Sequence, residues 1–338
     1  MGNLFKKEEA DQLLKKLSDV YDIYAPMVFK GEGCYSDTDS IRYGKIASFA
    51  DIVWDKKSDY SFKEVLLPIS DTILYFTEKE MKVPDPAEKK RMIFLRSCDL
   101  HALKRLDEIY LTNGAEDFYY KRVRENTRFV LMGCKESFDS CFCVSMGTNQ
   151  TDNYDAYIKM DGLSVYLEAK DEELRSLLED VASEEASFEI DYVIENKENV
   201  SIPDTLPENI QDAPLWEEYA GRCIGCGRCN FVCPTCTCFS MQDVFYQDNP
   251  KAGERRRVWC SCQVDGFTDM AGNISFRKDQ GARMRFKVLH KVYDYKKRFG
   301  YHMCVGCGRC EDVCPEYISY IACIRKLGEI KDGGNADE

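Results

Sequence analysis

Two short runs of the chain combine cysteine, glycine and proline in the same order. They read CIGCGRCNFVCP from residue 223 and CVGCGRCEDVCP from residue 304. Each follows the pattern C-x2-C-x2-C-x3-C-P, with which bacterial two-cluster ferredoxins bind [4Fe–4S] clusters. Three closely spaced thiolates wrap one cubane, and the fourth cysteine, displaced and followed by proline, serves the other cluster. The pattern predicts an electron-carrying iron–sulfur protein with at least two clusters.

The crossed pattern divides eight cysteines into two ligand sets. The first cluster is predicted to be bound by Cys223, Cys226, Cys229 and Cys314, and the second by Cys304, Cys307, Cys310 and Cys233. The glycines of the runs would let the backbone pass close to each cubane and donate N–H groups to sulfur; they are Gly225, Gly227, Gly306 and Gly308. Structural zinc sites lack such a repeated four-cysteine run, so zinc is the weaker interpretation.

Four more cysteines lie in the first half of the chain. Cys98 ends the apolar run MIFLRSC and Cys134 ends FVLMGC. Both would follow the carboxyl end of a predicted strand, where open α/β sheets place ligands. Cys141 and Cys143 follow on a predicted loop. The four thiols could hold a third cluster; alternatively, Cys98 and Cys134 are small buried apolar side chains, as free cysteines often are.

Two C-x-C pairs lie between the runs, Cys236 with Cys238 and Cys260 with Cys262. They could bind a metal or be buried thiols beside the first cluster, and their spacing does not decide. Siroheme enzymes pair C-x5-C with C-x3-C, a spacing that any two ferredoxin runs satisfy. Because those cysteines already fit the cluster sites, we expect no siroheme on this chain.

Hydrophobic periodicity outlines the elements that position these cysteines. Up to about residue 200, short apolar runs alternate with helical patterns, which predicts an α/β domain. The predicted strands are Ile23–Phe29, Val65–Ile69, Ile73–Phe76, Met92–Leu95 and Phe129–Met132. Helices are predicted near the N-terminus, with Ala10, Leu13, Leu14 and Leu17 on one face, around Leu100–Tyr110, and over Asp171–Ser183.

Composition shifts predict the domain boundaries. Residues 1–200 would form the α/β domain, and the proline-rich residues 201–214 a linker. Residues 215–330 would form a ferredoxin-like (α+β) dicluster domain with a long insertion between its two motifs, and residues 331–338 a flexible tail.

Composition also restricts the class of protein. The 338 residues carry a formal net charge of −13, which argues against a general nucleic-acid binder. Eighteen cysteines without a signal-peptide pattern favour metal ligands in a reducing, anaerobic cytoplasm over disulfides. No run of apolar residues is long enough to span a membrane. No G-x-G-x-x-G or Walker loop occurs, so the chain has no nucleotide-binding fingerprint of its own.

The order of these features resembles the iron–sulfur subunit of the dissimilatory-type anaerobic sulfite reductase over nearly the whole chain. The segments that carry the resemblance are YSDTDSI (35–41), LRSCDLHALKRLD (95–107), ESFDSCFCVSMGTN (136–149), CIGCGRC, CPTCTC, NPKAGERRR (249–257), GFTDMAG (266–272) and HMCVGCGRC (302–310). In that family, this component relays electrons from a flavin- and NADH-binding subunit to a siroheme subunit that reduces sulfite to sulfide. The resemblance implies FAD, NADH and siroheme on partner subunits only, and no catalytic residue on this chain.

Three alternatives remain from the sequence. A similarly built iron–sulfur protein serves cytosolic NAD(P)-linked sulfhydrogenases, with a nickel–iron partner. A zinc-binding module that only mediates assembly belongs to a different class, and a regulatory redox sensor is a third. Metal analysis separates zinc from iron, and the cofactor of the catalytic partner separates the two relays.

Overall fold

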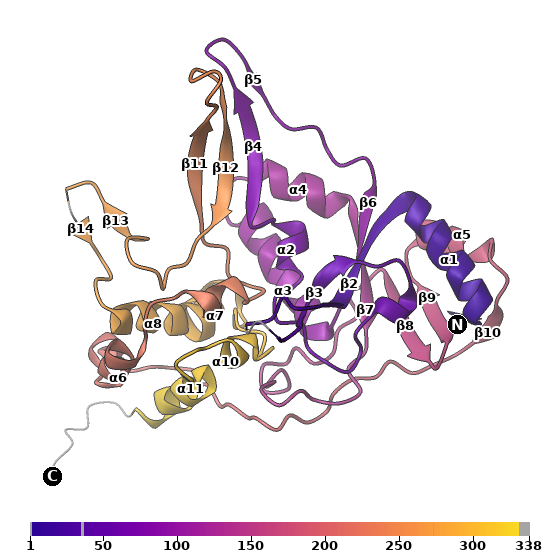
Figure 1. The fold of residues 1–338 in the computed structure, drawn as a ribbon. Helices are drawn as coiled ribbons and strands as arrows, with labels where there is room; N and C mark the ends of the chain where they lie inside the picture. Colours follow the sequence, from indigo (N-terminus) through magenta and orange to yellow (C-terminus); the bar gives the residue numbers. More distant parts are fainter. Residues whose placement is uncertain (1, 35–36, 273, 331–338) are drawn as a thin grey trace.

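The computed structural model describes residues 2–34, 37–272 and 274–330 (Figure 1). The predicted tail at 331–338 lies outside the described residues. The strands are β1 (Gly2–Phe5), β2 (Tyr21–Phe29), β3 (Ser40–Lys45), β4 (Ser70–Phe76), β5 (Met81–Lys82), β6 (Lys90–Leu95), β7 (Thr127–Met132), β8 (Ala156–Asp161), β9 (Ser164–Ala169), β10 (Glu184–Ala186), β11 (Phe239–Phe245), β12 (Gly253–Trp259), β13 (Asp269–Met270) and β14 (Ile274–Ser275).

Helices connect and cover these strands. The α-helices are α1 (Lys7–Val20), α2 (Lys63–Leu66), α3 (Ser97–Asp107), α4 (Phe118–Glu125), α5 (Glu172–Glu179), α6 (Leu215–Arg222), α7 (Arg228–Phe231), α8 (Gln280–Leu289), α9 (Tyr295–Phe299), α10 (Arg309–Asp312) and α11 (Tyr320–Glu329). Short 3-10 turns are η1 (Phe49–Asp51) and η3 (Ile210–Asp212), and π-helical turns are η2 (Glu108–Thr112) and η4 (His290–Asp294).

An eight-stranded mixed sheet forms the centre of the N-terminal region. Its strand order is β10-β1-β9-β8-β7-β6-β2-β3, and β2, β6, β7 and β8 run parallel to one another. Side chains of β6 alternate between two cores, so that Phe94 joins the one beneath α1 and α5, and Ile93 the one beneath α2 and α3. Both faces of the sheet are therefore buried, which confirms the predicted α/β N-terminal region.

The N-terminal helix was predicted from its apolar face and is confirmed as α1. Its four predicted contacts, Ala10, Leu13, Leu14 and Leu17, are buried against the large sheet. The sequence did not reveal β1, which precedes this helix and pairs with β9 and β10. A four-residue strand before a strong helical pattern gives too little periodicity to detect.

Four of the five predicted strands are confirmed as β2, β4, β6 and β7; each ends where predicted and begins two or three residues earlier. The strand predicted at Val65–Ile69 is wrong, because Val65 and Leu66 belong to the one-turn helix α2. Phe62 and Leu67 are buried beside them. A short apolar run is equally compatible with a buried strand and a buried helical turn, and tertiary packing decided for the turn.

A second sheet joins distant parts of the sequence. Its strand order is β11-β12-β4-β5, and Arg255 of β12 faces Leu74 of β4. In Figure 1 this sheet projects as a blade above the rest of the molecule. The segment between the two cysteine motifs therefore pairs with a strand of the N-terminal region. The predicted division at residues 201–214 stays a prediction; Ile210 in this stretch is buried in a core with Trp216 and Leu327.

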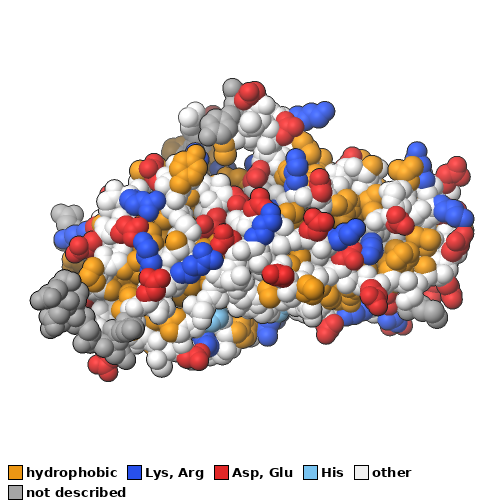
Figure 2. Space-filling model, turned by 90° about the horizontal axis from the view of Figure 1, so that it is seen from below, with side chains coloured by type: hydrophobic (Ala, Val, Ile, Leu, Met, Phe, Trp, Pro, Cys, Tyr) orange, Lys and Arg blue, Asp and Glu red, His pale blue; other side chains and the backbone are white. Residues whose placement is uncertain are grey.

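The molecular surface mixes charges of both signs. On the face shown in Figure 2, acidic and basic side chains are interspersed from end to end, with small apolar areas between them. Within the part of the chain that the structure describes, no helix is long and apolar enough to cross a membrane.

Candidate metal centres

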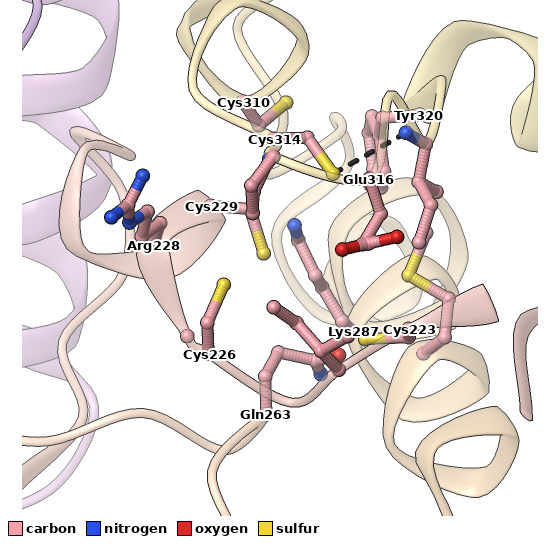
Figure 3. A pocket seen from close by; sticks show the side chains of 15 residues that line it. Cys223, Cys226, Arg228, Cys229, Gln263, Lys287, Cys310, Cys314, Glu316 and Tyr320 are labelled. Atoms are coloured by element: carbon pink, nitrogen blue, oxygen red, sulfur yellow. Dashed lines mark hydrogen bonds between the residues drawn. The ribbon is translucent and has the colours of Figure 1, made fainter. Parts of the chain in front are cut away.

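The first candidate centre is a cavity beside α7 and α8 (Figure 3). Cys223 follows the end of α6, Cys229 lies in α7, and Cys314 follows α10. The cysteines that line this cavity are Cys223, Cys226, Cys229, Cys310 and Cys314. All four members of the first predicted ligand set thus border one space, although they come from segments about 90 residues apart in the sequence. Cys226 is exposed to solvent.

The second candidate centre adjoins the first. Its cavity is lined by Cys229, Cys233, Cys304, Cys307 and Cys310. It contains the whole second predicted set, and shares Cys229 and Cys310 with the first cavity. The fourth cysteine of each run, Cys233 or Cys314, borders the cavity of the other run's first three. This is the crossed arrangement that the spacing predicted, and the assignment of ligands stays a prediction.

The two runs have the same local backbone geometry. The Gly225 N–H lies 3.4 Å from the sulfur of Cys223, and the Gly306 N–H lies 3.5 Å from that of Cys304. In both runs the next glycine, Gly227 or Gly308, takes a left-handed conformation just before a one-turn helix. Backbone amides are thus directed at the sulfurs, as they are around iron–sulfur clusters.

The second run packs directly against the loop that carries Cys141 and Cys143. Phe142 N–H donates to Gly306 O at 2.8 Å. A side chain at Gly308 would reach within 2.2 Å of Ser140 O, so glycine is required there by contact as well as by its φ of +70°. The N-terminal loop and the second centre therefore form one tightly packed unit.

The N-terminal cysteines lie at one edge of the large sheet. Strands β6 and β7 are parallel neighbours, Cys98 is in the first turn of the helix after β6, and Cys134 is two residues past β7. Cys141 and Cys143 are on a loop, buried at 7% and 9% exposure. The predicted elements around the four cysteines are confirmed, while a third cluster stays a prediction.

The electrostatic neighbours of these thiols show that they share one environment. Burial raises the pKa of Cys141 to about 12, and Cys143, Cys307 and Cys134 contribute in the same direction. Burial also raises the pKa of Cys98, to which Cys307 and Cys143 contribute. Thiols that resist ionisation in isolation become thiolates when they bind metal cations. A cluster next to Cys307 would have to bind these sulfurs as thiolates, and it stays a prediction.

Two buried lysines, Lys287 and Lys291, line the second cavity, and a third, Lys63, donates to Cys236 O at 2.8 Å. Lys63, Lys287 and Lys291 are 3–5% exposed. Burial alone lowers the pKa of Lys287, but the neighbouring sulfurs of Cys229 and Cys310 outweigh it and raise the pKa. In Figure 3 the Lys287 ammonium points in among the cysteines. Buried cations are stable only beside compensating negative charge, and a cluster bound by four thiolates supplies such charge.

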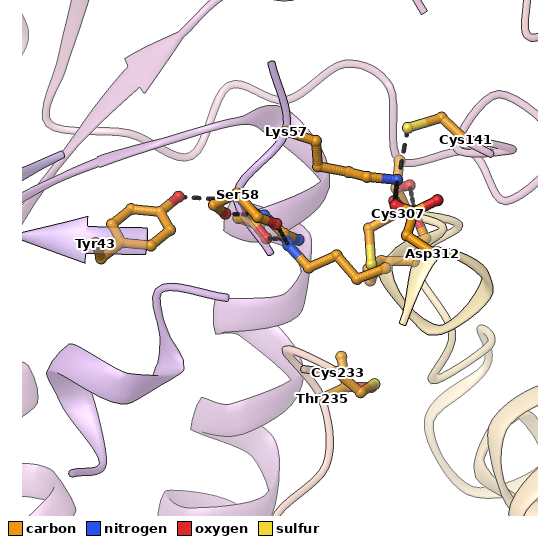
Figure 4. Close-up of polar contacts among 12 residues, drawn as sticks. Tyr43, Lys57, Ser58, Cys141, Cys233, Thr235, Cys307 and Asp312 are labelled. Carbon is orange, nitrogen blue, oxygen red and sulfur yellow. Dashed lines mark hydrogen bonds and ion pairs between the residues drawn. The ribbon is translucent and has the colours of Figure 1, made fainter. Parts of the chain in front are cut away.

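A fourth cation, Lys57, connects the third candidate centre to the second (Figure 4). Its ammonium donates to Cys307 O at 3.0 Å and pairs with Asp312 at 2.7 Å. Burial lowers the pKa of Lys57, but its acidic neighbours, with the Asp312 carboxylate in direct contact, outweigh burial and raise it. Lys57 thus joins the loop of Cys141 to the second cysteine run, whether or not a cluster is bound there.

A known domain family covers both cysteine runs. Residues 222–318 match the family described as 4Fe-4S dicluster domain. The chain carries a [4Fe–4S] dicluster domain. Along nearly its whole length it is also similar to sulfhydrogenase 2 subunit beta of Pyrococcus furiosus, with 27% identity over 343 residues, covering 95% of this chain and 96% of the relative. No solved structure matches the chain. The prediction of an iron–sulfur protein is confirmed at this level.

The polar residues that support the dicluster domain were not predicted from the sequence. Lys287 and Lys291 occupy the same helical face as Met284, Val288 and Val292, all of which are buried. Two lysines four residues apart on an apolar face were a signal that could have been recognised. Asn196, whose amide contacts the Cys143 sulfur at 3.6 Å, gave no such signal.

Replacing Cys141 by serine tests the third centre. If Cys141 is a ligand, the variant should bind about four irons fewer than the roughly twelve expected for three cubanes. Iron and acid-labile sulfide are measured per chain after anaerobic purification. Cys323→Ser is the control, because Cys323 is equally buried but lies in the core with Tyr219. If both variants contain about eight irons per chain, the four N-terminal cysteines are ordinary buried thiols and bind no cluster.

Proposed function

We propose that this chain is the iron–sulfur electron-transfer subunit of an anaerobic, cytoplasmic oxidoreductase complex. The observation that carries the proposal is the pair of adjoining cavities, each bordered by five cysteines that include one whole predicted ligand set, and flanked by buried ammonium groups. The matched dicluster domain family supports it. Bound clusters would supply one-electron transfer, which thiols and lysines alone do not perform.

We assign the first cluster to Cys223, Cys226, Cys229 and Cys314, and the second to Cys304, Cys307, Cys310 and Cys233. The chain's own residues hold the metal, keep water away and balance charge. Lys287 lines both cavities, and so does Tyr320, which is 3% exposed. We assign a third cluster to Cys98, Cys134, Cys141 and Cys143. The chain itself performs no acid–base catalysis in this proposal.

The first centre is suited to meet a partner subunit. Cys226 is exposed, and two apolar side chains near it, Ile224 and Tyr317, are 59% and 86% exposed. Electron transfer between proteins needs a cluster close to the surface, and exposed apolar side chains beside it favour docking. The partners would be a siroheme subunit and a second one that binds flavin and NADH.

We propose sulfite reduction to sulfide as the reaction of the complex. The segments that resemble the iron–sulfur component of anaerobic sulfite reductase, among them SCFCVSMGTN and CPTCTC, support this choice. The second candidate is a sulfhydrogenase complex, which the similarity to sulfhydrogenase 2 subunit beta along 95% of the chain favours. In both complexes this chain would have the same role, and only the catalytic partner differs.

Purifying the tagged chain with its partners under anaerobic conditions separates the two candidates. For sulfite reduction, we expect the complex to contain siroheme, seen in its absorption spectrum, and to oxidise NADH when sulfite is added. Nickel without siroheme, together with hydrogen-dependent reduction of a dye, would establish the second candidate. Zinc in place of iron in the isolated chain would refute electron transfer altogether.

A further inference from the structure

Two cysteines that belong to neither predicted ligand set lie together at the base of the β11–β12 hairpin. The antiparallel ladder ends with the pair Phe239 and Trp259, and the Cys260 N–H continues it by donating to Cys238 O at 2.9 Å. Cys262 follows two residues later and is 6% exposed. The thiols of Cys238 and Cys262 are hydrogen-bonded to each other. The hairpin thus holds two free thiols in contact.

The thiols of the two C-x-C motifs make pairwise contacts. The Cys236 thiol is hydrogen-bonded to Cys233, and that of Cys238 to Cys262. Each of these cysteines thus contacts one other thiol, and pairwise contact is the arrangement of a dithiol.

Buried amides stabilise the ionised form of one thiol of the pair. Asn230 Nδ2 donates to the Cys262 sulfur at 3.1 Å, and Gln263 Nε2 lies 3.7 Å from it. Both amide side chains are at most 2% exposed. The thiol of Cys238 and these donors lower the pKa of Cys262. Hydrogen-bond donors around a thiolate are what distinguishes a reactive cysteine from an inert buried one.

Asn230 also places the pair next to the first centre. Its side-chain oxygen lies 3.9 Å from the sulfur of Cys229, while its nitrogen contacts Cys262. One buried side chain therefore spans the gap between a proposed cluster ligand and the thiol pair. An asparagine in this position gives both sulfurs a polar partner.

We propose that Cys238 and Cys262 form a redox-active dithiol that is reversibly oxidised to a disulfide beside the first centre. With Cys262 as the thiolate, oxidation forms the S–S bond, breaks the S–H bond of Cys238, and releases one proton and two electrons. The proton leaves on the side of Cys238, which is partly exposed. The electrons pass to a one-electron acceptor of the iron–sulfur class, used twice. This coupling rests on the proposed function, whereas the existence of the dithiol does not.

Thiol mapping of the anaerobically purified full chain at controlled potentials tests the proposal. Samples poised with mediator dyes are quenched in acid, alkylated with iodoacetamide and digested for mass spectrometry. We expect both cysteines to be alkylated at low potential and a linked Cys238–Cys262 peptide at high potential. The ratio of disulfide to dithiol should change about tenfold for each 30 mV, as a two-electron couple requires.

Two variants sharpen the test. Cys262→Ser should abolish the linked peptide and leave the iron content unchanged, while the matched control Cys260→Ser, in the same hairpin, should retain the peptide. Alkylation of both cysteines at every potential would overturn the proposal, and so would loss of iron in Cys262→Ser, which would make this residue a metal ligand. Iron-free wild-type chain that still forms the linked peptide would support the dithiol and refute the electron-transfer function.

Discussion

Replacing Arg309 by methionine should destabilise the folded chain by about 3–5 kcal/mol. Arg309 and Asp99 form a bidentate pair with N–O distances of 2.8 and 3.0 Å, and their side chains are 2% and 0% exposed. The variant would leave the Asp99 carboxylate buried without its cation. The apparent free energy of unfolding, from the shift of the urea midpoint at unchanged m-value under anaerobic conditions, measures the effect.

A surface variant and a double variant show whether the loss of stability in Arg309→Met is caused by the burial of the ion pair. Arg325→Met removes a pair with Glu198 whose side chains are 46% and 38% exposed, and should cost about 0–1 kcal/mol. Arg309→Met combined with Asp99→Leu removes both charges and should recover part of the lost stability. A loss below about 1 kcal/mol for Arg309→Met alone would contradict the prediction. This pair ties α3 of the N-terminal region to α10 of the dicluster domain.

Replacing Lys287 by methionine should lower the reduction potential of the neighbouring cluster by on the order of 100 mV. Reduction adds a negative charge, which a nearby cation stabilises, so removing the cation disfavours the reduced state. With an effective dielectric constant of about 20, one charge several ångströms away contributes roughly 2–4 kcal/mol, and each 1.4 kcal/mol corresponds to about 59 mV for one electron.

An EPR-monitored redox titration of the anaerobically purified protein measures this shift. Lys296→Met is the matched control, because Lys296 lies on the following helix α9, is 36% exposed and pairs with Asp204. Water and salt screen its charge, so its removal should shift the potential far less. Equal potentials in the Lys287 variant and the wild type would show that this ammonium does not compensate cluster charge.

The fold could be predicted where periodicity was strong. The buried strands β6 and β7 and the amphipathic α1 were recognisable, because their apolar residues repeat with the period of the element. Val65–Ile69 was misassigned because four apolar residues fit either element. The pairing of β12 with β4 joins residues about 180 positions apart, and no local pattern encodes such a contact.

The sequence by itself determined the chemistry of this protein: two C-x2-C-x2-C-x3-C-P runs specify thiolates for clusters, because ligand spacing is a local property of the backbone. It also placed Cys98 and Cys134 after strands. Only the tertiary structure decided what surrounds these sulfurs. It brought Lys287 of α8 to the second centre, Lys63 of α2 to the backbone oxygen of Cys236, and Cys238 to Cys262 across a hairpin. Charge compensation and thiol pairing act through space, so they depend on packing and leave no fixed spacing along the chain.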